Sequence, residues 1–511
     1  MLEGLVTVLS PGFLLYLCIG VLAGILVGAL PGFTATMGTA LMLPFTFALP
    51  PLQGLAMLGA LYVAAMFADS VPACLVNTPG TPSAVATAFD GYQMTRQGKG
   101  QAALVASSFS ALVGTIIGGL TFLFLSPPLA SFALSFGPPE FFWVTVFALT
   151  IIGSIAGDSL LKGLAGGCLG MLVGAIGISA TGAVTRYTFG IPELQSGVDI
   201  VAALVGIFAI PQVLHMIRGR QQDQRVATYT RRRGVVRETV RDILSRPVNL
   251  LRSSIIGTVI GILPGAGSPV ASLVSYNEAV RWTRGERRRT FGRGNVDGVV
   301  ASEAAGNGAA GGSMVPLVAL GIPGSAPAAV ILGALLLQGL RPGPQLFGDN
   351  PTLVYGFAWS IMLAGFVTYL FGSLLSGTLA RMVMIPVHLL APIILFLSVV
   401  GSFAIRNQLV DVFLMLVLGV AAYFLSLLGF HPGPIGLGVI LGPILEPALV
   451  QSMALAKSTS VLAVFFGRPL SLVLIALTVT SVVWVVWSRS RERRRAEDET
   501  ARVREPEEAT S

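Results

Sequence analysis

Charged residues are scarce in this sequence. Asp, Glu, Lys and Arg make up 11% of its 511 residues, whereas 54% are hydrophobic and the mean hydropathy is +0.80. A soluble protein of this length needs far more charge to cover its surface. Several uncharged runs are long enough to cross a bilayer as a helix, which takes ~20 residues; they are 102–139, 163–185, 352–380, 412–445 and 470–488. The sequence therefore predicts an all-α polytopic integral membrane protein, with about 10–12 membrane segments.

Cysteine and histidine are also scarce, with three of each. The cysteines stand singly in apolar surroundings, which favours buried small hydrophobes over metal ligands; they are Cys18, Cys74 and Cys168. No histidine or lysine lies at a motif spacing that suggests a catalytic base. We therefore expect no enzyme, no cofactor and no metal other than a coupling Na⁺.

Three further motifs are missing. The first residues lack the basic start of a cleavable signal peptide, so we expect the first apolar segment to stay in the mature protein. The chain holds no G-x-x-x-x-G-K-[ST] loop, which argues against energy from ATP. Its basic residues are not accompanied by an aromatic-basic module, so nucleic acid is not an expected partner.

The net charge of +8 comes from clustered arginines. Ten arginines lie in 218–252, six in 281–293 and seven in 489–504, together 23 of the 32 Lys and Arg residues. All three clusters adjoin apolar runs, which under the positive-inside rule marks cytoplasmic loops. We expect them to contact anionic membrane lipid. The last cluster follows Trp484 and Trp487 as a charged cytoplasmic tail, 489–511.

Two glycine- and proline-rich motifs occur twice, in the same order. "GILVGALPGF" from Gly24 matches "GTVIGILPGA" from Gly257, and "VPACLVNTPGT" from Val71 matches "VPLVALGIPGS" from Val315. These pairs predict an internal duplication, with a first membrane repeat in 1–217, a basic linker in 218–246 and a second repeat in 247–488. Paired interruptions in two halves point to a transporter binding site. Taken singly, each has a structural alternative, a helix-packing face or a proline kink.

Charge and length together favour a re-entrant hairpin at "GILPGAGSPV". Arginines flank the segment on both sides, and the positive-inside rule opposes placing either basic loop outside. Arg252 to Pro264 and Pro269 to Arg281 are each twelve residues, or ~18 Å of helix, too short for a ~30 Å hydrocarbon layer. The turn must therefore be buried in protein or line a cavity. We expect Ser268 to cap the helix that starts at Pro269.

The interrupted segments supply the candidate binding residues. Free N–H groups and the positive end of a helix dipole favour a carboxylate. The predicted substrate-binding residues are Gly32, Thr34, Thr36, Asn77, Thr78, Gly80, Thr81, Gly265, Gly267, Ser268, Gly324 and Ser325. Intramembrane polar groups are costly and are functional candidates, and those predicted to couple an ion, Na⁺ or H⁺, are Asp69, Glu303 and Asn307. The alternative for Asp69 or Glu303 is a structural pair or a place at an interface.

Several long motifs resemble the large membrane subunit of tripartite tricarboxylate transporters. They include "GALPGFTATMGTALMLPFTF", "NTPGTPSAVATAFDGYQMTRQGKG", "FGIPELQSGVDIVAALVGIFAIPQVL", "GILPGAGSPVASLVSYNEA" and "EAAGNGAAGGSMVPLVALGIPGSAPAAVILGALLLQGLRPGP". The likeness runs from about Gly20 to Arg468, and departs from the family where an acidic Gly-Asp-type pair is expected near Lys457–Ser460.

This resemblance implies a secondary active transporter for a di- or tricarboxylate in the bacterial inner membrane. It also implies a small membrane subunit of about four helices, a periplasmic solute-binding protein and a Na⁺ or H⁺ gradient. A channel or an assembly scaffold without coupled transport is the alternative, and a membrane-embedded hydrolase using Ser268 lacks a motif-spaced base.

Overall fold

The computed structural model describes residues 1–30, 32–155, 159–179, 184–218, 234–383, 385 and 387–483. Predictions that fall on Pro31, on most of the basic linker, on Trp484 and Trp487 and on the charged tail lie outside these residues.

Nearly all of the described elements are helices. Those up to residue 218 are α1 (Leu2–Val8), α2 (Pro11–Ala29), α3 (Ala35–Phe47), α4 (Pro51–Ala68), α5 (Ser70–Val76), η1 (Pro82–Ala84), α6 (Val85–Arg96), α7 (Gly100–Ala133), α8 (Pro138–Ile155), α9 (Leu160–Gly174), β1 (Gly177–Ile178), β2 (Thr185–Arg186), η2 (Pro192–Ser196) and α10 (Ile200–Arg218). The two short strands pair in antiparallel fashion, with Gly177 opposite Arg186.

The remaining elements follow the basic linker. They are α11 (Val235–Leu244), α12 (Pro247–Ile262), α13 (Gly267–Trp282), η3 (Gly285–Thr290), α14 (Val296–Gly312), α15 (Met314–Leu320), α16 (Ala326–Leu337), α17 (Pro344–Asp349), α18 (Pro351–Leu374), α19 (Ser376–Met382), α20 (Val387–Arg406), α21 (Leu409–Leu427), α22 (Pro432–Ala456) and α23 (Val461–Phe466).

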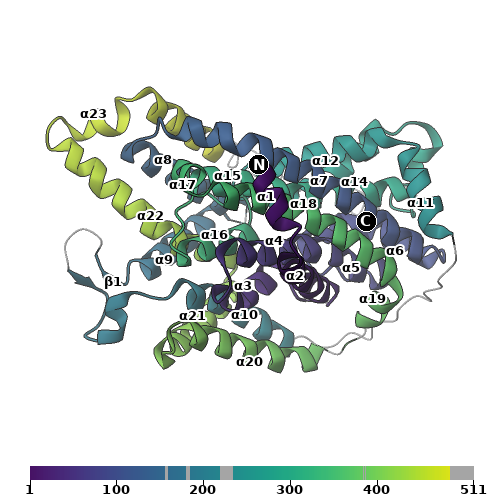
Figure 1. The fold of residues 1–511 in the computed structure, drawn as a ribbon, viewed down its shortest axis with the longest axis horizontal. Coiled ribbons are helices and arrows are strands. Elements are labelled where there is room, and N and C mark those ends of the chain that lie inside the picture. The colour runs from purple at the N-terminus through teal and green to yellow at the C-terminus, as the bar shows by residue number, and fades with distance from the viewer. Residues whose placement is uncertain are drawn as a thin grey trace, which may run out of the picture.

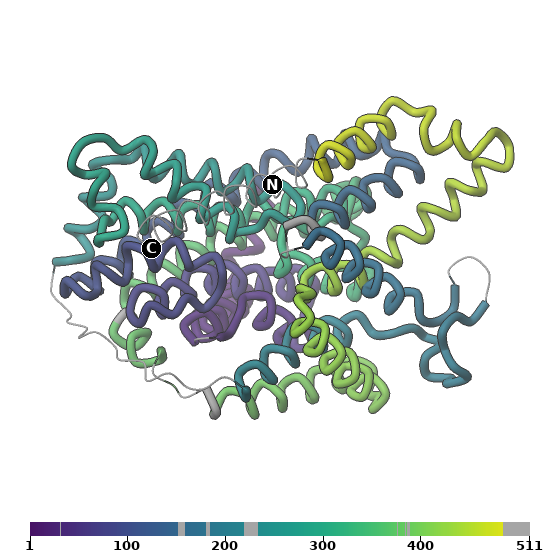
Figure 2. Tube along the Cα trace, turned by 180° about the vertical axis from the view of Figure 1, so that it is seen from behind, coloured from purple at the N-terminus to yellow at the C-terminus, as the bar shows by residue number. Residues whose placement is uncertain are grey.

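Eight helical segments in the described part of the chain are long and apolar enough to cross a membrane. Six shorter apolar helices accompany them, including α12, the arm that precedes the break at 263–266. The purple first-half helices α2, α3 and α4 lie at the centre, with other helices on either side of them (Figures 1 and 2). The expectation of a helical, multi-pass membrane protein is confirmed.

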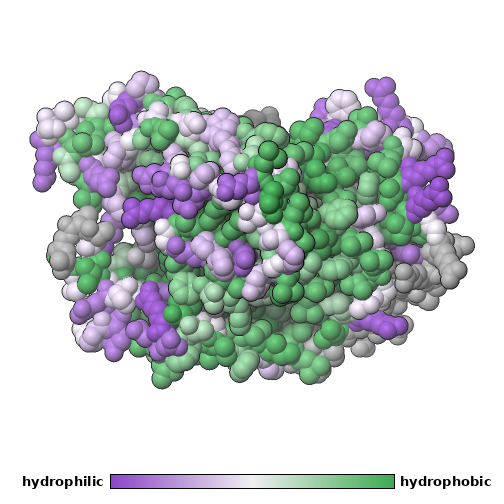
Figure 3. Space-filling model, viewed as in Figure 1, coloured by the Kyte–Doolittle hydropathy of each residue, from purple (hydrophilic) through white to green (hydrophobic). Residues whose placement is uncertain are grey.

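Apolar residues form a broad area across the middle of the face shown in Figure 3. Hydrophilic residues gather at its right edge, where α11 lies in Figure 1, and at its left edge near β1. An apolar area between two polar edges is the distribution that a bilayer selects.

Glycines let helix backbones touch in the interior. An added Cβ on Gly24 would lie 2.3 Å from the carbonyl oxygen of Leu61, and one on Gly28 2.4 Å from that of Ala65, so α2 lies directly on α4. In the same way, a Cβ on Gly257 would lie 2.1 Å from the carbonyl oxygen of Ala305, where α12 lies on α14. Such close approach is the role of small residues between membrane helices.

Glycine contacts also fix the directions of the long helices. Gly114 and Gly118 of α7 meet the carbonyls of Ala304 and Gly308, so α7 and α14 run parallel. Gly119 of α7, in contrast, meets Met362 of α18.

Going backward along α7 from Gly119, each contacting residue meets a residue further along α18. Gly365 meets Thr115 and Gly372 meets Ser108, so α7 and α18 are antiparallel. Helix α18 is parallel to α4, because Gly356 packs on Leu52 and the later Gly372 on Phe67. It follows that α4 and α14 point in opposite directions.

We expect Gly257→Ala to destabilise the protein, although alanine is the better helix former by about 1 kcal/mol. The added Cβ has no room against the Ala305 carbonyl, and overpacking of this kind costs about 1–3 kcal/mol. The measurement is the thermal unfolding midpoint of the detergent-purified protein. Gly12→Ala in α2 is the matched control, since its Cβ meets nothing within 4 Å. An unchanged or raised midpoint for Gly257→Ala would contradict the close contact.

Candidate functional site

The predicted interruptions are breaks between helices. Helix α2 ends at Ala29 and α3 begins at Ala35, while α12 ends at Ile262 and α13 begins at Gly267. Gly32, Gly265 and Gly267 have φ of 83°, 79° and 58°, a left-handed region in which glycine pays no steric cost.

The second motif pair forms breaks as well. The residue that follows α5, Asn77, has φ of 55°, and the residue that follows α15, Gly321, has φ of 73°. The two breaks of the second half meet, because the Gly265 N–H donates to the Gly324 carbonyl at 3.0 Å. The two groups of predicted binding residues in the second half, 265–268 and 324–325, therefore lie next to each other in the fold.

Ser325 joins both halves of the chain. Its hydroxyl caps α16 by accepting from the Ala328 N–H at 3.3 Å. It also lies 3.0 Å from the Tyr62 hydroxyl of α4 and 3.4 Å from the Ser313 hydroxyl. Tyr62 is fully buried, so this hydroxyl cluster lies inside the protein rather than against lipid.

Thr34 and Ser268 both lie at helix starts beside the breaks, but only Thr34 is a helix cap. Thr34 caps α3 by accepting from the Met37 N–H at 3.2 Å. The prediction that Ser268 caps its helix is wrong, because α13 already begins at Gly267 and Ser268 lies within its first turn. The Ser268 hydroxyl instead donates to the Gly306 carbonyl of α14 at 2.9 Å.

Asp69 lies at the junction between α4 and α5 and is 1% exposed. Its Oδ2 accepts from the Thr81 hydroxyl and, at 2.8 Å, from the Ser83 hydroxyl. Gly80 packs beside it, where a Cβ would lie 3.5 Å from the Gly28 carbonyl oxygen and 3.6 Å from the Asp69 Cβ. The break after α5 therefore folds back onto the carboxylate that precedes it.

Glu303 of α14 is also buried, with 3% exposure. Its Oε1 accepts from the Thr87 hydroxyl at 2.5 Å, and its Oε2 from the Ser107 hydroxyl at 3.1 Å. Ser107 lies 2.6 Å from the hydroxyl of Ser70, the residue after Asp69. Neither carboxylate makes an ion pair within the described residues; each is paired instead with neighbouring hydroxyl groups.

Asn307 follows Glu303 by one helical turn. Its amide nitrogen donates to the Glu303 carbonyl at 3.1 Å. Its Oδ1 is buried and has no hydrogen-bond partner among the described residues. An unpaired buried carbonyl of this kind is costly and is available to a ligand.

The other predicted residues are less tightly engaged. The Thr78 hydroxyl donates to the Val76 carbonyl at 3.3 Å, and Thr36 lies half-buried in the first turn of α3. Sequence reasoning missed the hydroxyls that support the site, namely Tyr62, Ser70, Ser83, Thr87, Ser107 and Ser313. Ser313 had a sequence signal, because it stands three residues before Pro316 as Asp69 does before Pro72.

Another prediction concerns the three cysteines. Cys74 is buried as expected, Cys18 is half-buried, and Cys168 is exposed, so the prediction of burial is wrong for Cys168. Cys168 lies on α9, whose buried positions are glycines that face other helices.

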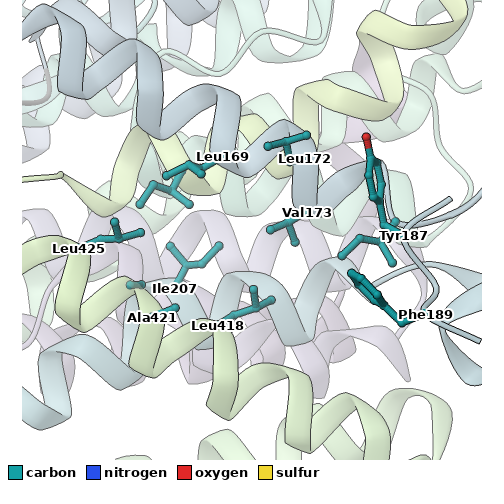
Figure 4. A pocket seen from close by; sticks show the side chains of 12 residues that line it. Leu169, Leu172, Val173, Tyr187, Phe189, Ile207, Leu418, Ala421 and Leu425 are labelled. Carbon is teal, nitrogen blue, oxygen red and sulfur yellow. The ribbon is translucent and has the colours of Figure 1, made fainter. Parts of the chain in front are cut away.

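A lateral pocket of about 370 Å³ lies elsewhere, between α9, α10, α21 and α22 (Figure 4). Its lining is almost wholly apolar, with Leu172, Ile207 and Leu425 among its residues. A carboxylate would lose its hydration there without gaining donors. The helix breaks therefore stay the better candidate site.

We expect Asn77→Gly to preserve the fold and Asn77→Ala to cost about 1–2 kcal/mol. Asn77 holds a left-handed backbone, which glycine adopts freely and alanine resists. The unfolding midpoints of the two purified variants provide the measurement. Equal stability of both variants would show that the backbone at this break is not constrained.

Comparison with known proteins agrees with this architecture. The sequence model of the "Tripartite tricarboxylate transporter TctA family" matches residues 14–437. An Agrobacterium vitis protein described as "Uncharacterized 52.8 kDa protein in TAR-I ttuC' 3'region" is 33% identical over 491 residues, 96% of each chain. A second, "Uncharacterized protein in TAR-II ttuC' 3'region" of the same organism, is 33% identical over 238 residues, 47% of this chain and 97% of its own. No solved structure matches. The chain belongs to the tripartite tricarboxylate transporter TctA family.

Proposed function

We propose that this protein is the transporting subunit of a secondary carboxylate transporter. It moves a di- or tricarboxylate across the bacterial inner membrane with a Na⁺ or H⁺ gradient. The observation that carries this proposal is the meeting of helix breaks inside the protein, where Gly265 contacts Gly324 and Ser325 contacts Tyr62. Family membership supports a transporter rather than an enzyme.

Helix N-termini at the breaks supply the seat for the substrate. Helices α3, α13 and α16 each begin at a break, so each presents unpaired N–H groups and a positive dipole end. In the second half the seat comprises Gly265, Gly267, Ser268, Gly324 and Ser325. Carboxylates bind well at such termini without a charged side chain.

The first half supplies the matching surface around α3 and η1. Its residues are Gly32, Thr34, Thr36, Asn77, Thr78, Gly80 and Thr81. The hydroxyl of Thr34 is committed to its helix cap, and that of Thr81 to Asp69. The remaining groups and the backbone are the ones available to substrate.

Inverted repeats support alternating access between 1–217 and 247–488. Asp69 and Ser313 are equivalent, since each ends a long helix and contacts the hydroxyl residue after the next break, Thr81 or Ser325. Gly80 packs on the Gly28 carbonyl, and Gly324 on the Gly261 carbonyl. The equivalent helices α4 and α14 point in opposite directions, as in transporters built from inverted repeats.

The arms around 263–266 support a re-entrant hairpin. Helices α12 and α13 have sixteen residues each, about 24 Å of helix, and they pack against one another. Arginines stand at the outer ends of both arms, because Arg246 immediately precedes α12 and Arg281 lies in the last turn of α13. Both ends of the hairpin then lie at the same basic, cytoplasmic surface.

Ion coupling is assigned to Asp69, Glu303 and Asn307. Two buried carboxylates with hydroxyl donors alone are costly as anions, because no cation offsets the lost hydration. Binding H⁺ or Na⁺ removes this cost. The free Asn307 Oδ1 adds a neutral oxygen for the ion.

The proposed partners are a small membrane subunit of about four helices and a periplasmic solute-binding protein. The family description "tripartite" supports further subunits. The binding protein would deliver the carboxylate to the outer face of this chain, and bilayer lipid would cover the apolar area of Figure 3.

The test is uptake of a carboxylate panel into proteoliposomes that carry this subunit, the small subunit and the binding protein. We expect uptake to need a Na⁺ or proton gradient. Asp69→Asn should lower it at least tenfold, because an amide does not change charge when the ion binds.

Ser268→Ala and Asn77→Gly should each lower uptake several-fold while membrane abundance stays unchanged. Ser458→Ala, an exposed position on a loop, is the matched control. Unchanged uptake in both variants would overturn the proposed seat. Flux that needs no gradient would indicate a channel, and an intact complex without flux a scaffold.

A further inference from the structure

Hydrogen bonds connect helix α6, and the residue that follows it, to the second half at three positions. Thr87 lies 2.8 Å from the Ser302 hydroxyl and 2.5 Å from Glu303. One turn further along α6, Asp90 receives hydrogen bonds from two separate segments. Beyond α6, the Gln97 amide donates to the Arg293 carbonyl at 2.7 Å.

Asp90 is the centre of this fastening. Its Oδ2 accepts from the Tyr276 hydroxyl of α13 at 2.9 Å. Its Oδ1 accepts from the N–H groups of Gly294 and Asn295, at 2.9 and 2.7 Å, just before α14. The side chain is 0% exposed. One carboxylate therefore ties α6, α13 and the start of α14 together, and we call these residues the Asp90 clasp.

The clasp is closely packed. A Cβ on Gly298 would lie 2.2 Å from the Asp90 Oδ2, so only glycine fits there. The Tyr276 ring meets Phe89 and Phe291 edge-on, at centroid distances of 5.3 and 5.8 Å. Aromatic rings thus cover the hydrogen bonds on two sides.

The clasp lies between Glu303 and the arginine-rich rim. Along α14, Asn295 caps the helix, Gly298 packs on Asp90, and Glu303 follows about one turn later. On the other side, Arg287 and Arg246 pair with Asp297, at 3.0 and 2.7 Å. Passage from the basic surface to the buried carboxylates along this route requires the clasp to open.

The opposite half has no equivalent clasp. Ala334 stands nine residues after Ser325, as Asp90 does after Thr81. Leu43 stands eleven residues after Gly32, as Tyr276 does after Gly265. The corresponding contact on the other side of the protein is therefore apolar, and the polar closure belongs to one side alone.

We propose that the Asp90 clasp is the cytoplasmic gate of this protein, shut in the conformation described here. The inference rests on the proposed function, because a gate presumes alternating access. Opening separates α6 from α13 and from the start of α14, and it breaks the three hydrogen bonds of Asp90 together. Hydrogen bonds to a charged group are strong, so their loss should shift the balance toward the open state.

The first test measures access from the cytoplasmic side. A single cysteine replaces Val299, which is buried beside Gly298, in a chain whose three native cysteines are changed to alanine. In inside-out vesicles, Asp90→Asn should raise its rate of maleimide labelling about tenfold, and Tyr276→Phe severalfold. Tyr92→Phe on the same helix is the matched control and should leave the rate unchanged. No increase in either clasp variant, with folding verified by gel filtration, would overturn the gate.

The second test uses a covalent cross-link to prevent the clasp from opening. Cysteines replace Gln97 and Arg293, and a short thiol-reactive linker joins them in the same cysteine-free chain. Cross-linked protein should lose uptake, and a cleavable linker should restore it on reduction. Full uptake by completely cross-linked protein would overturn the gate.

The two proposals fail differently. Labelling of position 299 requires no transport, so raised labelling in a protein that moves no carboxylate would uphold the clasp and overturn the proposed function. Gradient-driven uptake that the cross-link does not reduce would uphold the proposed function and overturn the gate.

Discussion

Direct contact between helix backbones determines where polar groups lie in this protein. Gly28 and Gly261 bring their helices onto the carbonyls of Ala65 and Ala309, just before two of the breaks. A bulkier residue would move those helices apart and open the breaks to lipid, where their free N–H and C=O groups have no partner. Close packing is thus the condition under which a broken helix is tolerated in a membrane interior.

Within this packed interior, the two halves have different chemistry at equivalent positions. Asp69 places a carboxylate beside one break, whereas Ser313 places a hydroxyl beside the other. A carboxylate attracts a cation, while hydroxyls and N–H groups donate to an anion. Under the proposed function, the carboxylate at Asp69 would attract the coupling ion, and the donors around Ser313 would serve the acid.

Much of this arrangement was predictable from local sequence. Glycine readily adopts the positive φ found at helix ends, and proline lacks the N–H that a helix interior needs. The glycines and prolines of the sequence therefore predicted the breaks near Gly32, Gly265 and Gly324. The helical membrane class followed from composition. The resemblance to the tricarboxylate transporter family, drawn from quoted motifs, is confirmed over residues 14–437.

What sequence did not predict depends on contacts between distant segments. Ser268 lies within α13 because the helix begins at Gly267, two residues before the predicted start at Pro269. Tyr62 and Thr87 gave no local signal, because their partners lie more than two hundred residues away. The duplication, the hairpin orientation and the binding roles stay predictions that transport and accessibility measurements address.

The long helices have a mechanical consequence. Helix α7 of the first half packs along α14 of the second, and α18 of the second packs along α4 of the first. Each half therefore has a long helix packed along a helix of the other half. The two halves therefore cannot separate as two rigid bodies without losing these helix–helix contacts. In the proposed alternating access, these packed helix pairs would stay together while the short helix α6 moves against them.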